Sequence, residues 1–222
     1  MFCYYRDFTL KKITNKKFRH LFFILFWPAY LLAFILTEKF VIPIYDIYSP
    51  LDELIPFCEL FIIPYFLWYA LLAFVSLYTL FYDVKAFKKF YAFLSITSAI
   101  SFLIYVIFPS MQNLRPDTFA RENMFVDAVK NLYAIDTNTN VCPSIHVVFT
   151  LGMLFALWNT RHFCTKLWRI VLVATTIVIC LSTMFLKQHS IIDVVAGIVL
   201  SAVVFPLVFG KFNTQNNFFK KE

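Results

Sequence analysis

Long apolar runs, separated by short charged segments, dominate this amino-acid sequence. A helix needs roughly 20 apolar residues to cross the hydrocarbon core of a bilayer. Six runs meet or approach that length, and the fourth is the shortest. They are Leu21–Thr37, Leu60–Phe81, Tyr91–Pro109, Ser144–Trp158, Leu167–Leu186 and Ile191–Phe209. The pattern predicts an all-α fold, an integral membrane bundle of about six transmembrane helices.

The composition supports the bilayer as a partner and disfavours two other classes. Charged residues make up only 15% of the chain, whereas a soluble domain carries about 25%. A nucleic-acid-binding protein and a secreted, disulfide-rich protein are therefore disfavoured. Cys58 and Cys142 could both lie near one face and form a disulfide, but we expect free cysteines. Without a repeat or linker, residues 1–222 are expected to form a single domain, and the sequence leaves the oligomeric state open.

Basic residues are distributed unequally between the two sides of the predicted membrane. If the N-terminus is cytoplasmic, 15 of the 20 Lys and Arg residues lie on the cytoplasmic side. Because short cytoplasmic loops are enriched in Lys and Arg, this distribution predicts the orientation. We expect both termini in the cytoplasm and the outer loops, which alternate with cytoplasmic loops, on the extracytoplasmic side of a plasma membrane. The outer side keeps Lys39, Arg115, Arg121, Lys130 and Lys187.

One predicted outer loop, Ser110–Cys142, is much longer than the others. Within it Phe125, Val129 and Leu132 recur at helical spacing beside charged residues. This pattern predicts a short amphipathic helix lying on the membrane surface. A plain surface helix explains most of its residues, although such a helix could also cover a lipid-entry site.

Polar and ionisable residues at the ends of the apolar runs are the candidates for a functional site. Ionisable groups at membrane depth are costly, so they mark functional positions when they are not the ends of snorkelling side chains. In the predicted topology, three separate segments bring such residues to the outer ends of the helices. They are Arg115 and Pro116, then Pro143, Ser144 and His146, and finally Ser182, Lys187, His189 and Asp193.

The two histidines in this group suggest phosphoryl-transfer chemistry. His189 and Asp193 lie four residues apart, on one helix face, so the carboxylate could accept a hydrogen bond from the imidazole. The other ring nitrogen would then be free as a nucleophile or base. Such a pair alone is more often structural. His146 adds a second imidazole at the same depth, and two imidazoles with Arg and Lys donors are what phosphoryl transfer through a covalent intermediate requires.

The order of these residues also forms a recognisable three-part motif. It consists of Arg115-Pro116, the segment Cys142–His146, and Ser182-Thr183 followed by His189 and Asp193. The order resembles the signature of the type 2 phosphatidic acid phosphatase family. That family includes vanadium haloperoxidases, and it grades without a sharp boundary into inositol phosphorylceramide synthases and other lipid phosphotransferases. The six-span plan with an outward-facing site is similar to its membrane members over essentially the whole chain.

The resemblance implies a role for each matching residue. His189 would attack phosphorus and form a phosphohistidine, with Asp193 orienting the ring. His146 would protonate the leaving alkoxide and then activate the incoming water or alcohol. The phosphate oxygens would be held by Arg115, by the Ser144 hydroxyl with nearby backbone N–H groups, and by Ser182. The scheme needs no metal and no cofactor.

The sequence departs from the family pattern at two positions. The family's first motif usually has a lysine where this chain has Phe108, and its third motif usually has an arginine where this chain has Thr183. Two of the usual cations are therefore missing. Lys187 could supply one of them, although a snorkelling lysine at a span end explains it equally well. Arg121 or Lys130 could also approach from the outer loop.

We therefore expect a lipid phosphatase that acts on a lipid phosphate or diphosphate ester from the extracytoplasmic side. Thr183 resembles the phosphotransferase branch, so the first alternative is an enzyme of the inositol phosphorylceramide synthase type that passes the phosphoryl head group to an alcohol. The second alternative is a non-catalytic lipid-binding or transport protein. Its mark would be the loss of a histidine or the aspartate, and His146, His189 and Asp193 are all present.

Overall fold

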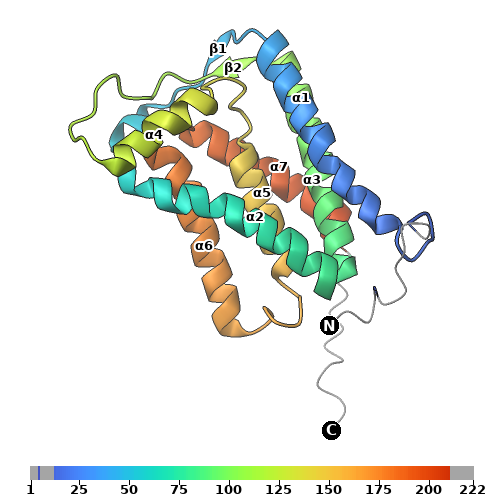
Figure 1. Ribbon diagram of the computed structural model, residues 1–222. Coiled ribbons are helices and arrows are strands. Elements are labelled where there is room, and N and C mark those ends of the chain that lie inside the picture. The colour runs from blue at the N-terminus through green and yellow to red at the C-terminus, as the bar shows by residue number, and fades with distance from the viewer. Residues whose placement is uncertain (1–4, 6–12, 211–222) are drawn as a thin grey trace.

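The computed structural model describes Tyr5 and residues 13–210 (Figure 1). In this part of the chain, seven α-helices are joined by 3-10 turns and two short strands. The α-helices are α1 (Phe26–Phe40), α2 (Ile62–Tyr82), α3 (Val84–Ile107), α4 (Met124–Ile135), α5 (Ile145–Leu157), α6 (Lys166–Phe185) and α7 (Ile191–Phe209). The 3-10 turns are η2 (Arg19–Leu25), η3 (Pro50–Leu54) and η4 (Glu59–Phe61). Strands β1 (Tyr45–Asp46) and β2 (Ser110–Met111) pair in parallel, with Tyr45 opposite Ser110.

Five helical segments within the described residues are long and apolar enough to cross a membrane, which confirms the expected all-α membrane bundle. They comprise η2 with α1, η4 with α2, and the single helices α3, α6 and α7. Helix α5, which corresponds to the shortest apolar run, has 13 residues and falls below that length. Large apolar side chains cover the outside of the bundle, with Leu207 75% and Ile107 71% exposed. Such exposure suits contact with lipid rather than water.

Helix α3 begins earlier than the apolar run that predicted it. The run starts at Tyr91, whereas the helix starts at Val84. The carboxylate of Asp83 accepts a hydrogen bond from the Ala86 N–H at 2.9 Å, which satisfies one of the amides left unpaired at a helix start. The first turns also carry lysines, which an apolar criterion excludes although lysine is a good helix former. The cap, rather than hydropathy, sets this boundary.

Helix α5 lies in the middle of the bundle and packs against α2, α3, α6 and α7 (Figure 1). Two glycines allow its neighbours to approach closely. A Cβ atom on Gly152 would lie 2.9 Å from the ring of Phe93 in α3. A Cβ atom on Gly197 of α7 would lie 3.0 Å from the Ser144 carbonyl oxygen at the start of α5. Gly197 therefore permits the close contact between α7 and the beginning of α5.

Helices α5 and α7 begin at the same end of the bundle, which we call the site end. The 110–142 segment lies there as well, because Asn140 at its end donates a hydrogen bond to Glu38 near the end of α1, at 2.9 Å. The site end carries the five basic residues predicted for the outer side. The opposite end carries nine described basic residues: Lys16, Lys17, Arg19, Lys85, Lys88, Lys89, Arg161, Lys166 and Arg169. The other basic residues assigned to the cytoplasmic side, Arg6, Lys11, Lys12, Lys211, Lys220 and Lys221, lie outside the described residues.

The amphipathic helix predicted in the long loop is α4, which packs on the site end of the bundle. Its buried side chains are Val126, Val129 and Leu132. Val129 and Leu132 join a cluster with Ile62 and Tyr65 of α2. The helix therefore covers the site end of α2 with its apolar face. Cys58 and Cys142 are free thiols.

Candidate active site

The candidate site is built where the first turns of α5 and α7 meet. The Ser144 N–H donates to the Asp193 carbonyl oxygen at 3.1 Å and joins the two helix starts directly. The Ser144 side chain caps α5 by accepting from the Val147 N–H, and Ser190 caps α7. Because both residues end a loop and begin a helix, His146 and His189 are held close to one another although they are distant in sequence.

His189 is oriented by the carboxylate four residues later in the chain. The histidine precedes the cap Ser190 and lies outside α7, so the expectation that it shares a helix face with Asp193 was wrong. Its Nδ1 atom lies 3.2 Å from Oδ2 of Asp193, which is fully buried. The same carboxylate oxygen accepts from the Ser190 N–H at 3.0 Å. The backbone N–H of His189 donates to the Thr183 carbonyl oxygen at 3.1 Å. With Nδ1 donating to Asp193, the lone pair at Nε2 is available for attack on an electrophile.

His146 lies in an aromatic environment. Its ring centroid is 4.8 Å from that of Tyr65, 4.5 Å from that of Trp68 and 5.9 Å from that of His189. Its Nε2 atom is buried and has no hydrogen-bond partner among the described residues. A buried polar atom without a partner is costly, so such an atom is a candidate for contact with a ligand. The structure thus brings together the two histidines that the sequence selected.

Arg115 is bonded to the residue before His189, and both terminal nitrogens of its guanidinium already have partners. Nη1 donates to the Tyr133 carbonyl oxygen at 3.1 Å, and Nη2 donates to the Asp136 carbonyl oxygen at 2.6 Å. Nη2 also donates to Oε1 of Gln188, the residue before His189, at 2.5 Å. Burial lowers the pKa of Arg115, while the charge of Asp136 opposes that shift. The Nε atom is buried without a partner in the described structure, so one donor remains for an anion.

The two serines of the motif differ in what their hydroxyl groups can still do. Both are fully buried. The Ser144 hydroxyl oxygen accepts from the Val147 N–H at 3.5 Å, so its hydrogen is free to donate to a phosphate oxygen. The Ser182 hydroxyl donates to the Ile179 carbonyl oxygen at 2.6 Å. Ser182 would have to rotate before it could contact a phosphate.

Lys187 reaches into the structure rather than outward to solvent or lipid headgroups. Its Nζ atom donates to the backbone carbonyl oxygen of Asp52 at 2.7 Å. Its backbone has a φ of 53°, a left-handed conformation that is uncommon for residues other than glycine. Burial lowers the pKa of Lys187, against the opposing effect of the Asp52 charge. The lysine lies two residues before the nucleophile candidate, and its bond to Asp52 uses one of the three donors of its ammonium group.

The two positions where the family has cations hold neutral side chains with other contacts. Phe108 stacks on Tyr45, with ring centroids 4.3 Å apart. The Thr183 hydroxyl donates to the Cys180 carbonyl oxygen at 2.8 Å. Arg121 is mostly exposed and lies 3.6 Å from the Glu59 carboxylate, and Lys130 lies 3.9 Å from Asp127. Within the described residues, two cations therefore approach His189. Lys187 lies two residues before it in the chain, and Arg115 bonds to the adjacent Gln188.

Sequence reasoning did not select three polar residues that surround this site. Asp136 accepts from the Tyr65 hydroxyl at 2.7 Å and from Nε2 of Gln188 at 3.2 Å. Asp52 contacts the start of α7, as described below. Gln188 could have been selected from the sequence, because it directly precedes His189. Asp52 and Asp136 are distant in sequence and reach the site only because the chain folds back over it. No group of three or more His, Cys, Asp or Glu residues in the described part of the chain is arranged to hold a metal ion.

Comparison with known proteins identifies a related family. The model of the PAP2 superfamily matches residues 89–217, which is more than half of the chain. The matched segment contains Arg115, Ser144, His146, His189 and Asp193. It begins near the start of α3, so α1, α2 and the loop between them precede it. Neither a curated protein nor a solved structure matches the chain.

Proposed function

Because this chain belongs to the PAP2 superfamily, we propose that it is a membrane enzyme that hydrolyses a lipid phosphate or diphosphate ester through a phosphohistidine intermediate. Membership implies a phosphatase or phosphotransferase that acts on phosphate esters. The observation that carries the proposal is the pair of histidines. His189 is held by Asp193, and its ring centroid lies 5.9 Å from that of His146.

In the first step, Nε2 of His189 attacks phosphorus and a P–N bond forms. The P–O bond to the leaving alcohol breaks, and its electron pair remains on the alcohol oxygen. His146 enters the step protonated and gives its proton to that oxygen, which lowers the barrier to its departure. Asp193 stabilises the positive charge that develops on His189 and keeps Nδ1 as the donor.

In the second step, the neutral His146 accepts a proton from water as the water oxygen bonds to phosphorus. The P–N bond breaks and returns its electron pair to His189. Inorganic phosphate leaves, and both rings regain their starting protonation states. One residue thus acts as acid and then as base, which suits the unpaired Nε2 of His146.

Phosphate oxygens are bound at the start of α5 in this proposal. The first N–H groups of a helix lack partners within the helix and attract anions. In α5 these include the amides of Ile145 and His146, next to the free hydroxyl hydrogen of Ser144. At the start of α7, by contrast, carboxylates already accept from Ser190 and Ile191. The geometry therefore favours α5 over α7 as the phosphate-binding helix.

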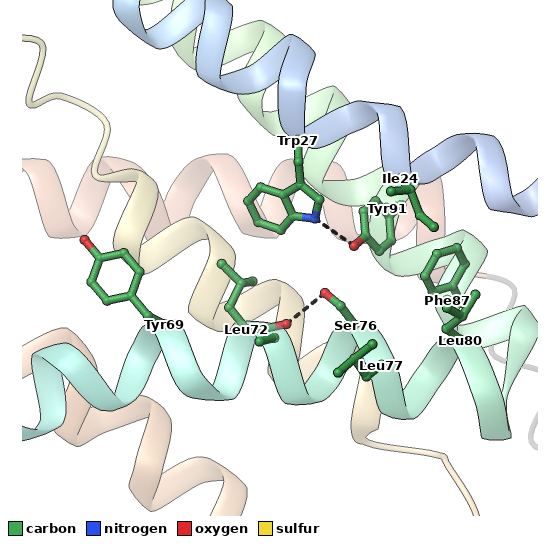
Figure 2. Close-up of a pocket in the computed structure, with 10 residues that line it drawn as sticks. Ile24, Trp27, Tyr69, Leu72, Ser76, Leu77, Leu80, Phe87 and Tyr91 are labelled. Carbon is green, nitrogen blue, oxygen red and sulfur yellow. Dashed lines mark hydrogen bonds between the residues drawn. The ribbon is translucent and has the colours of Figure 1, made fainter.

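An apolar cavity that extends from Tyr69, near His146, toward the opposite end of the bundle supports a lipid as the substrate. It has a volume of about 420 Å³ and lies among α1, α2 and α3 (Figure 2). Two of its polar side chains donate within the cavity wall: Nε1 of Trp27 to the Tyr91 hydroxyl at 2.9 Å, and the Ser76 hydroxyl to the Leu72 carbonyl oxygen at 2.8 Å. Tyr69 lines the cavity, and its ring centroid lies 6.4 Å from that of His146. A hydrocarbon chain fits such a wall, and its phosphate end would then lie near His146.

The orientation of the site is part of this proposal. The excess of basic residues at the opposite end of the bundle supports an extracytoplasmic site and cytoplasmic termini. A reporter fused after Glu222 should be active only in the cytoplasm, and one inserted between Asp117 and Asp136 only outside. The reverse pattern would contradict the orientation.

A phosphotransferase is the second candidate, favoured by the neutral Thr183 in place of the usual arginine. In that case an alcohol, rather than water, would attack the phosphohistidine. The two candidates differ in their product. Hydrolysis releases inorganic phosphate, whereas transfer produces a new phosphorylated lipid and no free phosphate.

The purified protein in detergent, incubated with a panel of lipid phosphates and diphosphates, tests both candidates. We expect inorganic phosphate from at least one substrate, and none from the His189→Ala variant. A new lipid that appears only when an alcohol is added would establish the phosphotransferase instead. Binding of the lipids without any turnover would favour the non-catalytic alternative and overturn the proposal.

A further inference from the structure

Asp52 is a buried carboxylate in the loop between α1 and α2. It belongs to η3, and only 2% of its surface is exposed. This loop precedes the part of the chain that matches the PAP2 superfamily. A buried charge is costly unless several hydrogen bonds compensate it. The partners of this carboxylate therefore show what it holds in place.

The partners of Asp52 lie on both sides of His189 in the chain. Oδ2 accepts from the Ser190 hydroxyl at 2.6 Å, and Oδ1 accepts from the Ile191 N–H at 2.8 Å. The backbone carbonyl oxygen of Asp52 accepts from Nζ of Lys187 at 2.7 Å. One residue of the α1–α2 loop thus holds the segment before His189 and the segment after it.

Asp52 and Asp193 share the first turn of α7. Asp193 accepts from the Ser190 N–H and from His189, whereas Asp52 accepts from the Ser190 hydroxyl and from the next amide, that of Ile191. Negative charge is stabilising at a helix N-terminus, where the amides point outward. Ser190 is bonded to both carboxylates, so a shift of Asp52 would be passed to Asp193 and then to the His189 ring.

We propose that Asp52 is a positioning residue for His189. It acts through the Ser190 hydroxyl, because Ser190 is the residue bonded to both carboxylates, and it keeps the Asp193 carboxylate and the His189 ring in line for attack. This inference rests on the proposed function, because positioning matters only if His189 is the nucleophile. Asp52 also accepts from the Ser49 N–H at 2.8 Å within its own turn. The test must therefore separate positioning from the stability of η3.

The neighbouring residue Glu53 provides a matched control. It lies in the same turn and is also a carboxylate, but it is exposed and bonds to the Tyr48 hydroxyl instead of α7. Asp52→Asn keeps the size of the side chain and removes its charge, and Glu53→Gln does the same one residue later. A third variant, Ser190→Ala, removes the hydroxyl that links Asp52 to α7.

The experiment measures kcat and KM for a lipid phosphate in detergent micelles, together with thermal unfolding of each variant. Because Asp52 does not touch the substrate in this proposal, Asp52→Asn should lower kcat by about tenfold or more with KM changed by less than about threefold. Glu53→Gln should stay within about twofold of the parent in both constants. Ser190→Ala should lower kcat in the same way, and the double variant should be no slower than Asp52→Asn, because one chain of contacts is broken in each case.

Several outcomes would overturn the proposal. They are a kcat of Asp52→Asn within about twofold of the parent, multiplicative losses in the double variant, or a rise in KM alone. If Asp52→Asn does not fold, Ser190→Ala decides, and an unchanged kcat in that variant refutes the positioning role.

If the parent shows no turnover, the proposed function has failed. The ¹⁵N NMR signals of the His189 ring, assigned with His189→Gln, then judge the placement of the ring. The positioning role requires that Asp52→Asn changes them and Glu53→Gln does not.

Discussion

The two histidines at the site end have opposite surroundings, although their rings lie 5.9 Å apart. His189 is bonded to a buried carboxylate. His146 packs against Tyr65 and Trp68 of α2, and its Nε2 atom has no partner in the described structure. One ring is held by directed hydrogen bonds and the other by the shape of an aromatic wall.

This difference assigns different tasks to the two rings. A nucleophile must present one nitrogen along one line of attack, and a hydrogen bond to the opposite nitrogen provides that direction. An acid and base must exchange a proton with the substrate and should not be bonded permanently to another group. His189 meets the first requirement, and His146 meets the second.

The largest expected effect comes from removing the imidazole ring of His189. His189→Ala should abolish the covalent phosphoenzyme and lower turnover by at least about 10⁴-fold, because the group that forms the P–N bond in the proposed mechanism is removed. Trapping with a radiolabelled lipid phosphate and acid quench measures the intermediate. A labelled phosphoenzyme that persists in this variant would show that the two roles are reversed or that another residue is the nucleophile.

Removing the ring in the aromatic environment should have a smaller effect, which depends on the substrate. His146→Ala should slow turnover by about a hundredfold or more with an ordinary lipid phosphate, because the leaving alkoxide receives no proton. A substrate with a good leaving group should recover much of that loss, since its departure needs little protonation. His162→Ala is the matched control: this histidine lies at the opposite end of the bundle and bonds to the Tyr78 hydroxyl. Recovery in His189→Ala rather than in His146→Ala would contradict the comparison.

The contrast between the two rings was only partly visible in the sequence. The four-residue spacing of His189 and Asp193 predicted their hydrogen bond, which the structure contains. The shared helix face was wrong, because His189 precedes the cap Ser190 and the contact closes the turn that leads into α7. The aromatic surroundings of His146 come from α2, whose position depends on how the whole bundle packs. The lengths of the apolar runs identified the membrane helices, but they missed the start of α3, where Asp83 supplies a cap and the first turns are charged.

The contacts that cross between loops and helices were not predictable from spacing. The residues next to Asp52, beginning with Ser49 and Pro50, are typical of a local turn. Nothing in that pattern predicts a contact with α7. Lys187 appeared equally suited to snorkelling and to phosphate binding, and the structure instead shows its Nζ atom on the Asp52 carbonyl oxygen. Such contacts depend on which loops fold over the site end, and the sequence pattern contains no measure of that.

A variant at Lys187 tests whether a positive charge close to His189 contributes to turnover. Lys187→Met keeps much of the stem and removes the charge, so turnover should fall by about tenfold, equivalent to about 1.4 kcal/mol in the barrier. Because burial lowers the pKa of Lys187, its charge is lost at a lower pH than that of an ordinary lysine. The parent should therefore lose activity as the pH rises through that lowered pKa, and Lys187→Met should lack this alkaline decline.

Lys39→Met is the control for this charge, since Lys39 is exposed at the same end of the bundle. It should leave turnover within about twofold of the parent at every pH. If Lys187→Met also stays within that range, the lysine only ties its loop to Asp52. The missing cation would then have to be sought at Arg121 and Lys130.

The smallest expected effect concerns how the aromatic environment holds His146. The Tyr65 ring packs on His146, while its hydroxyl donates to Asp136, which in turn accepts from Gln188 beside His189. If ring shape is what matters, Tyr65→Phe should lower turnover by less than about threefold, although the lost hydrogen bond should cost about 1 kcal/mol in stability. Tyr65→Leu, which removes the ring face, should cost clearly more turnover than Tyr65→Phe. A loss of about tenfold or more in Tyr65→Phe would show that the hydroxyl links the two histidines through Asp136. The polar surroundings of His189 and the aromatic surroundings of His146 would then not be independent.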